Sequence, residues 1–292
     1  MIEGFEIGHH TADGDGWLTG TTVVVARGGA VGGVDVRGGG PGTRETDLLN
    51  PTTAIDRVHA VVLTGGSAYG LAAANGVMAG LEHAGIGWPV GLEPHQVVPI
   101  VPAAVIFDLG RGGAFRNRPT EDFGRLALAA ATSEPPATGS VGAGTGAVCG
   151  GIKGGFGYVE KELDSGVSVA AAVVVNAAGS VVDPATGRLW ADRMQLLATP
   201  ADDERDALVF DPHVRVVEDL VDEPSRLAIV PRGKATQWKG TICVGQVGSS
   251  APGPDDLVLR CYQSVITEAI PRAAEPLARS SCVEVHVVCI RE

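Results

Sequence analysis

A glycine followed by a threonine opens a short apolar run late in the chain, in the segment QWKGTICVG at 237–245. If the Thr241 hydroxyl attacked the Gly240 carbonyl, an N-to-O acyl shift and hydrolysis of the ester would leave Thr241 as a new N-terminus. Its free α-amine, with an ordinary pKa of about 8, could then act as the base for its own hydroxyl. Glycine upstream permits the strained backbone that such an attack requires. Gly240-Thr241 is therefore a candidate self-cleavage site, although ordinary strands also begin in this way.

A second set of reactive side chains lies in the final apolar run, at 282–290. Because side chains alternate along a strand, Cys282, Glu284 and His286 share one face, and valines occupy the other. Such a row could support nucleophilic chemistry. It is also typical of the solvated face of an edge strand.

Three glycine-rich stretches could bring backbone N–H groups to a ligand, at 37–47, 64–71 and 139–151. The second follows a strand pattern and opens a helix pattern, so it could hold an anion or a developing oxyanion. Close packing of strand on helix would explain the same glycines. The third has spacing that could cradle a phosphate, but the Lys-Ser/Thr of a P-loop does not follow it.

Composition and charge exclude several classes of function. The formal net charge of −12 argues against a nucleic-acid partner, which selects a basic surface. No basic and apolar leader opens the sequence, and no apolar run approaches the roughly 20 residues that span a bilayer. We therefore expect a cytoplasmic protein without a membrane partner. The five cysteines lack CxxC spacing and predict buried thiols. His9 and His10 could form a metal pair, but neighbours in a strand point to opposite faces and cannot easily bind one metal, so we expect surface histidines.

Periodicity predicts an irregular alternation of strands and helices. Runs of β-branched residues predict strands at 21–26, 33–37, 59–64, 166–176, 226–230, 241–247 and 282–290. Helical patterns lie at 67–85, 121–132 and 254–270. This order favours a layered α/β sandwich, and we expect one domain over residues 1–292.

Long stretches of the first two thirds of the chain resemble one family of amide hydrolases. They are 18–51, 57–82, 98–110, 139–151, 153–157 and 173–187. These segments closely resemble the L-aminopeptidase/D-esterase family, which includes β-aminopeptidases and the nylon-oligomer hydrolase. The similarity runs almost without a break through residues 1–190.

The resemblance implies an αββα fold of the N-terminal-nucleophile type, and cleavage into a long subunit, 1–240, and a short one, 241–292. It implies hydrolysis of a small amide or short peptide, no metal or organic cofactor, and a homo-oligomer, commonly a tetramer. Tyr69, in GGSAYGL, matches the active-site aromatic residue of the family. Asn176, in VVVNAAG, matches the asparagine that helps to form the oxyanion hole.

The last third departs from the family pattern. Aligned on Ile242, the chain places Gly240 at the nucleophile position, and a shift of one residue restores Thr241. The family's lysine after the GAGTGA loop falls at Gly151, and the acidic element near the C-terminus is replaced by a segment in which Glu284 is the nearby carboxylate. Two functions remain open. The first is an aminopeptidase-like hydrolase with a self-generated N-terminal threonine. The second is an uncleaved, diverged member, used for acyl transfer or cyclisation in biosynthesis or for binding without catalysis.

Overall fold

The computed structural model describes residues 1–36, 41–149, 151–162, 168–177, 241–245 and 283–291. The strands are β1 (Glu6–Gly14), β2 (Trp17–Asp35), β3 (Thr43–Arg44), β4 (Val58–Thr64), β5 (Trp88–Pro89), β6 (Val97–Val98), β7 (Ala103–Val105), β8 (Val148–Cys149), β9 (Ile152–Lys153), β10 (Phe156–Glu162), β11 (Ser168–Ala177), β12 (Thr241–Gly245) and β13 (Val283–Arg291). The helices are α1 (Ala73–His83) and α2 (Glu121–Ala129), with 3-10 turns η1 (Asp47–Leu49), η2 (Ser67–Ala72) and η3 (Gly142–Gly144).

The long strand β2 belongs to two sheets. Its first part pairs with β1 and β4, and β7 and β3 continue this first sheet beyond β4. Its last part, Val31–Asp35, pairs with β12, and β13, β11 and β10 continue the second sheet. The register between β2 and β4 shifts between Val25 and Ala30, where the strand passes from one sheet to the other.

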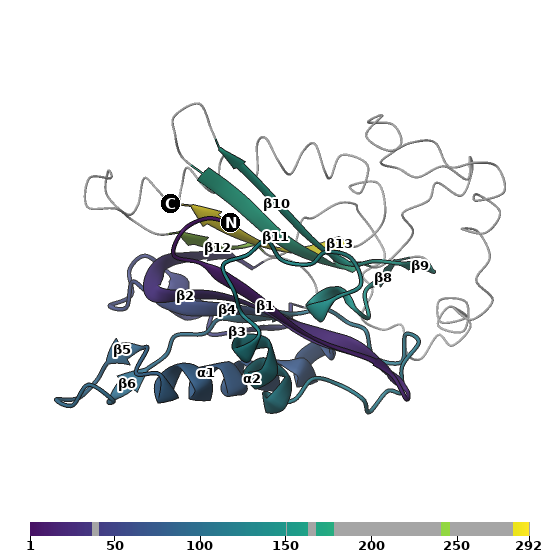
Figure 1. Ribbon diagram of the computed structural model, residues 1–292, viewed down its shortest axis with the longest axis horizontal. Coiled ribbons are helices and arrows are strands. Elements are labelled where there is room, and N and C mark those ends of the chain that lie inside the picture. The colour runs from purple at the N-terminus through teal and green to yellow at the C-terminus, as the bar shows by residue number, and fades with distance from the viewer. Residues whose placement is uncertain (37–40, 150, 163–167, 178–240, 246–282, 292) are drawn as a thin grey trace.

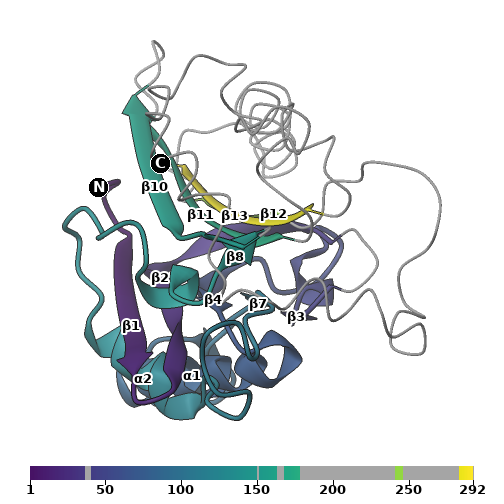
Figure 2. The same cartoon turned by 90° about the vertical axis from the view of Figure 1, so that its right-hand side faces the viewer.

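The described elements form three layers, with α1 and α2 below the first sheet and the second sheet above it (Figures 1 and 2). One buried cluster lies between the helices and the first sheet and includes Val23, Val25 and Val77. Another joins the two sheets and includes Val24 and Val174. Successive residues of β2 pack into different clusters, so both faces of the first sheet are buried. This explains why β2 contains a continuous apolar run.

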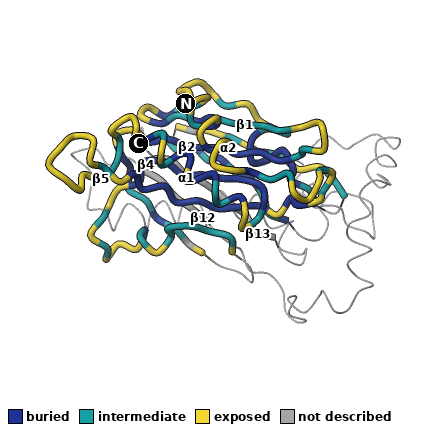
Figure 3. The backbone as a smooth tube through the Cα atoms, turned by 90° about the horizontal axis from the view of Figure 1, so that it is seen from below, coloured by how far each residue is buried: buried dark blue, intermediate teal, exposed yellow. Residues whose placement is uncertain are grey.

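Helix α1 packs closely on α2 because glycines replace larger residues at the contact. A Cβ on Gly76 would lie 1.9 Å from the Glu121 carbonyl oxygen, and one on Gly124 would lie 1.8 Å from the Ala73 carbonyl oxygen. Figure 3 shows the buried strands at the centre and the exposed loop after β5 at one end. The helices thus cover the face of the first sheet that is turned away from the second sheet.

Several sequence-based predictions are confirmed, with shifted boundaries. The strands predicted at 59–64, 166–176, 241–247 and 282–290 correspond to β4, β11, β12 and β13. The two strands predicted at 21–26 and 33–37 are one strand, β2, because its glycine-rich middle continues the strand instead of turning. The helix predicted at 67–85 begins as η2 before α1, and that at 121–132 is α2. The predicted strand at 226–230 and helix at 254–270 lie outside the described residues.

Among the described residues, no helix is both long enough and apolar enough to cross a membrane.

Candidate active site

Asn176 lies next to the end of β11, and its side chain bridges the two sheets. Its Oδ1 accepts a hydrogen bond of 2.8 Å from the backbone N–H of Phe107, just beyond β7. This contact orients the amide, since the oxygen faces Phe107 and the NH2 group, the donor of this side chain, is held on the other side. An oriented amide donor is what an oxyanion site needs.

The turn after β4 brings Tyr69 to the same end of the first sheet. Gly66 and Ser67 both have a left-handed backbone, with φ of 83° and 51°. The Ser67 N–H donates to the Ile106 carbonyl at 2.9 Å, so the turn is bonded to the residue directly before Phe107. Tyr69 follows two residues later in η2. The structure therefore brings the segments that carry Tyr69 and Asn176 together.

The backbone N–H groups of the two glycines that open this turn, Gly65 and Gly66, already have hydrogen-bond partners. Gly65 donates to the Gly20 carbonyl at 2.9 Å, and Gly66 donates to the Asp108 carboxylate at 2.6 Å. A Cβ on Gly70 would lie 1.8 Å from the Gly65 carbonyl oxygen. Close packing therefore explains these glycines, and the N–H groups of Gly65 and Gly66 are not available to an oxyanion.

Asp108 is a buried carboxylate that fixes the turn, and sequence reasoning gave it no role. It is 4% exposed and accepts hydrogen bonds from Gly66 N–H and, at 2.6 Å, from the Thr19 hydroxyl. Burial raises its pKa, although both hydrogen bonds and the nearby Arg111 oppose the rise. The available signal was an acidic residue directly after a buried apolar run.

Two arginines stack on aromatic rings at this end. The Arg118 guanidinium lies 3.6 Å from the ring centroid of Tyr69, and that of Arg111 lies 5.1 Å from Phe107. The two rings are 55% and 40% exposed, so both reach the surface. Burial lowers the pKa of Arg111, and Asp108 and the Cys149 thiol oppose the shift. The predicted site is thus bordered by aromatic rings and positive charge.

The third glycine-rich stretch packs against β1 and β2 and does not form a phosphate cradle. The Gly142 N–H donates to the Thr11 hydroxyl at 2.8 Å, and the Ala143 N–H donates to that of Thr22 at 3.0 Å. A Cβ on Gly142, whose φ is 51°, would lie 2.2 Å from the Thr22 Oγ1. These donors are therefore used within the fold.

His9 and His10 are half-buried and not fully exposed, as surface residues would be. His9 Nδ1 lies 2.9 Å from the Thr22 Oγ1, and its ring packs edge-on against Phe156. His10 packs in the same manner against Phe123. Burial lowers the pKa of both imidazoles, an effect that the Ala137 backbone opposes at His9. Cys149 is buried, as predicted for the thiols.

The pairing of the second sheet places the residues of the C-terminal part. Asn176 of β11 is directly opposite Glu284 of β13, so these two positions share a row. Thr241 begins β12 and is paired with Val287 of β13 and with Asp35 of β2. It therefore lies two strands from Asn176 and in a different row. Gly240 lies outside the described residues.

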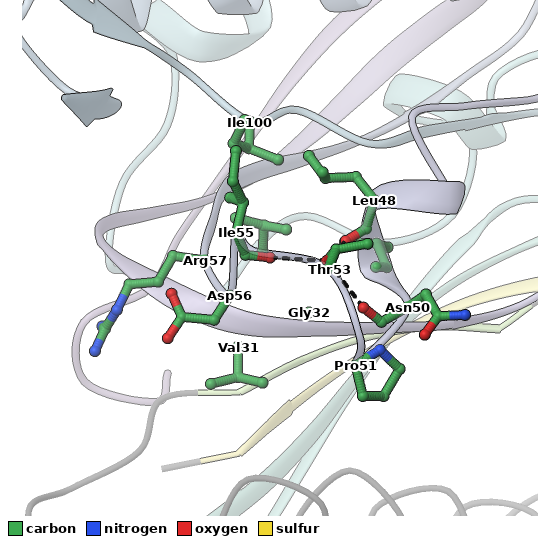
Figure 4. Close-up of a pocket in the computed structure, with 12 residues that line it drawn as sticks. Val31, Gly32, Leu48, Asn50, Pro51, Thr53, Ile55, Asp56, Arg57 and Ile100 are labelled. Carbon is green, nitrogen blue, oxygen red and sulfur yellow. Dashed lines mark hydrogen bonds between the residues drawn. The ribbon is translucent and has the colours of Figure 1, made fainter. Parts of the chain in front are cut away.

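A separate cavity of about 90 Å³ lies near the beginning of β4, between β2 and η1 (Figure 4). Its lining includes Val31, Leu48 and Ile100, with Asp56 and Arg57 at its side, and the Thr53 hydroxyl donates to nearby carbonyls. The predicted site is at the other end of β4.

Within the described ranges, no three histidine, cysteine or acidic residues gather in a way that could hold a metal ion.

Solved structures with a similar fold include two aminopeptidases. A β-aminopeptidase from Burkholderia sp. is 17% identical with a TM-score of 0.62, over 99% of this chain and 71% of that one. The L-aminopeptidase D-Ala-esterase/amidase of Ochrobactrum anthropi, described as a new variant of the Ntn hydrolase fold, is 16% identical with a TM-score of 0.61, over 100% of this chain and 72% of that one. The expected α/β fold of the N-terminal-nucleophile type is therefore confirmed.

Closer relatives in sequence are mycobacterial. Uncharacterized aminopeptidases of Mycobacterium tuberculosis and Mycobacterium bovis are 52% identical over 197 residues, which is 65% of this chain. The alignment covers 55% of the length of these relatives, so the chain spans about half of each. The family model described as Peptidase family S58 matches residues 2–230. Because that match covers most of the sequence, the chain belongs to peptidase family S58.

Proposed function

We propose that the chain is an aminopeptidase-like hydrolase that cleaves the amide bond of a short peptide or a small amide. The observation that carries this proposal is the hydrogen bond from Phe107 N–H to Asn176, which holds an amide donor beside the turn that carries Tyr69. Membership of peptidase family S58 and the aminopeptidase names of its mycobacterial relatives support the same activity.

In this proposal the nucleophile is Thr241, freed by cleavage of the Gly240-Thr241 bond. The α-amine of Thr241 takes the proton of the hydroxyl, whose oxygen attacks the carbonyl carbon of the substrate. The Asn176 NH2 group and the Tyr69 hydroxyl donate to the oxyanion that forms. The leaving amine then takes the proton, and water hydrolyses the ester. Glu284 is the carboxylate in the row of Asn176.

A second function is favoured by the position of Thr241. In the uncut strand, Thr241 lies two strands from Asn176 and in a different row. That placement suits an uncleaved, diverged member, which would carry out acyl transfer or cyclisation in biosynthesis or would bind without catalysis. The two functions differ in whether the chain is cut.

Intact-mass measurement separates these alternatives. We expect two fragments of the purified protein, 1–240 and 241–292, with Thr241 at the new N-terminus and with hydrolysis of L-alanine p-nitroanilide. The matched variants are Thr241→Ala, which should remain uncut and inactive, and Thr241→Ser, which should retain cleavage. A single full-length species after prolonged incubation, without amidase activity, would overturn the hydrolase proposal and support the uncleaved alternative.

The proposal includes a homo-oligomer, with a tetramer as the expected state because the family commonly forms one. Light scattering coupled to size-exclusion chromatography measures the mass in solution. A monomer at micromolar concentration would contradict this part of the proposal.

A further inference from the structure

Arg118 has a positive charge for which the described part of the chain provides no acidic partner. Its guanidinium lies 3.6 Å from the ring centroid of Tyr69. Among the described residues, no carboxylate forms an ion pair with Arg118, and no oxygen accepts a hydrogen bond from it. Stacking on a ring leaves the edge of the guanidinium, with its N–H donors, available to an anion.

Arg111 provides the contrast within the same loop. Its Nη1 donates to the Val148 carbonyl at 3.2 Å, and its charge interacts with the buried Asp108. Arg111 therefore holds the loop against the protein, whereas the contact of Arg118 within the described residues is with a ring and not with an acid. On a chain of net charge −12, a cation held in this way needs an explanation beyond general solubility.

A continuous series of contacts connects Arg118 with the predicted oxyanion donor. Arg118 stacks on Tyr69, and Tyr69 lies two residues after Ser67. Ser67 N–H is bonded to the Ile106 carbonyl, and the next residue, Phe107, donates to Asn176. The guanidinium is therefore connected, through Tyr69 and its turn, to the segment that carries the proposed oxyanion donor.

We infer that Arg118 is a specificity-determining residue that binds a carboxylate of the substrate. This inference rests on the proposed hydrolase function and names the class of substrate, which is a short peptide with a free carboxylate. Guanidinium binds carboxylate in a planar, two-point geometry that lysine cannot reproduce. In the form of this inference that is tested, the carboxylate is at the C-terminus of the substrate, on the residue directly after the scissile amide.

The test compares two substrates that differ in charge at one end. L-alanylglycine carries the C-terminal carboxylate, and L-alanylglycinamide replaces it with a neutral amide. In the wild-type protein we expect kcat/KM to be higher for L-alanylglycine than for the amide. In Arg118→Gln we expect this preference to fall at least about tenfold, because the variant loses a charge-assisted hydrogen bond to the carboxylate. Arg116→Gln is the matched control, since Arg116 is exposed in the same loop and the variant removes the same charge. Its preference should be unchanged.

A third substrate identifies the source of the carboxylate. L-alanyl-L-glutamic acid α-amide carries its anion on a side chain. If Arg118→Gln slows hydrolysis of this compound and not that of L-alanylglycine, Arg118 binds acidic side chains and the C-terminal form of the inference is wrong. If Arg118→Gln slows hydrolysis of L-alanylglycine and not that of this compound, the C-terminal form of the inference is supported.

A binding measurement separates failure of this inference from failure of the proposed function. If the wild-type protein hydrolyses none of the peptides, the hydrolase proposal fails, and calorimetry with N-acetylglycine and N-acetylglycinamide still tests Arg118. Tighter binding of the acid than of the amide, lost in Arg118→Gln, supports the anion site. An equal preference in the wild type and Arg118→Gln overturns it. Loss of unfolding stability without a change in preference also overturns it, because Arg118 would then act through contacts within the fold and not on the ligand.

Discussion

Replacement of Asp108 tests whether this buried carboxylate fixes the turn below Tyr69. Asp108→Ala removes the acceptor of the Thr19 hydroxyl, which is 1% exposed, and that of the Gly66 N–H. Each buried donor left without a partner costs about 1–3 kcal/mol, so the two together cost about 2–6 kcal/mol. Relief from burying a charge offsets part of this, and we expect a net loss of about 2–4 kcal/mol in the free energy of unfolding.

Asp108→Asn is the matched control for this prediction. The amide oxygen can still accept from Gly66, and the Thr19 hydroxyl can reverse its role and accept from the amide NH2. The variant should therefore unfold within about 1 kcal/mol of the wild type. Urea unfolding at neutral pH measures all three proteins. A loss for Asp108→Ala no larger than that for Asp108→Asn would refute the assigned role.

The stabilities of the wild type and Asp108→Asn should also differ in their dependence on pH. Burial raises the pKa of Asp108 above its unfolded value of about 3.9. Its contribution to stability is therefore fully present below that value and is lost as the pH rises through the folded pKa. As the pH rises through the folded pKa of Asp108, Asp108→Asn should therefore become more stable relative to the wild type. A constant difference between pH 3 and pH 8 would contradict the burial effect.

His59 and Gly70 give two further tests. His59 is buried, its Nδ1 accepts from the Ile100 N–H at 3.1 Å, and burial followed by the charge of Arg57 lowers its pKa. The contribution of His59 to stability is present above about pH 6.5 and is lost as the pH falls through the folded pKa. Acidification should therefore lower the melting temperature of His59→Asn less than that of the wild type. Gly70→Ala would place a Cβ 1.8 Å from a backbone oxygen and should cost about 1–3 kcal/mol in urea unfolding. Gly28→Ala, with no atom within 4 Å, should cost less than about 0.5 kcal/mol, and equal losses would contradict the packing argument.

Strands with strong β-branched patterns were predictable from the sequence, but their arrangement was not. β4 is buried at every residue and mostly apolar, because both of its faces are covered. β1 was missed because its half-buried pattern, EIGHHTADG, contains histidines, glycines and acids. The continuation of β2 through its glycines depends on partners in two different sheets, which local sequence does not specify.

The candidate site was predictable where it depends on residue type within a long motif. The resemblance indicated Tyr69 and Asn176, and the structure places their segments side by side. Asp108 was missed because its partners, Thr19 and Gly66, are 89 and 42 residues away and meet it only in the folded chain. The stacking of Arg118 on Tyr69 depends on the path of the loop before α2, which no periodicity describes.

The position of β12 has a consequence for how a cut chain would behave. β12 begins at Thr241 and is paired on one side with β2 and on the other with β13, which comes from the same C-terminal part. A broken bond before Thr241 would remove no hydrogen bond of these ladders. The two pieces would therefore elute together in a native buffer and separate only in a denaturant, so a nicked molecule would pass as intact in size-exclusion chromatography.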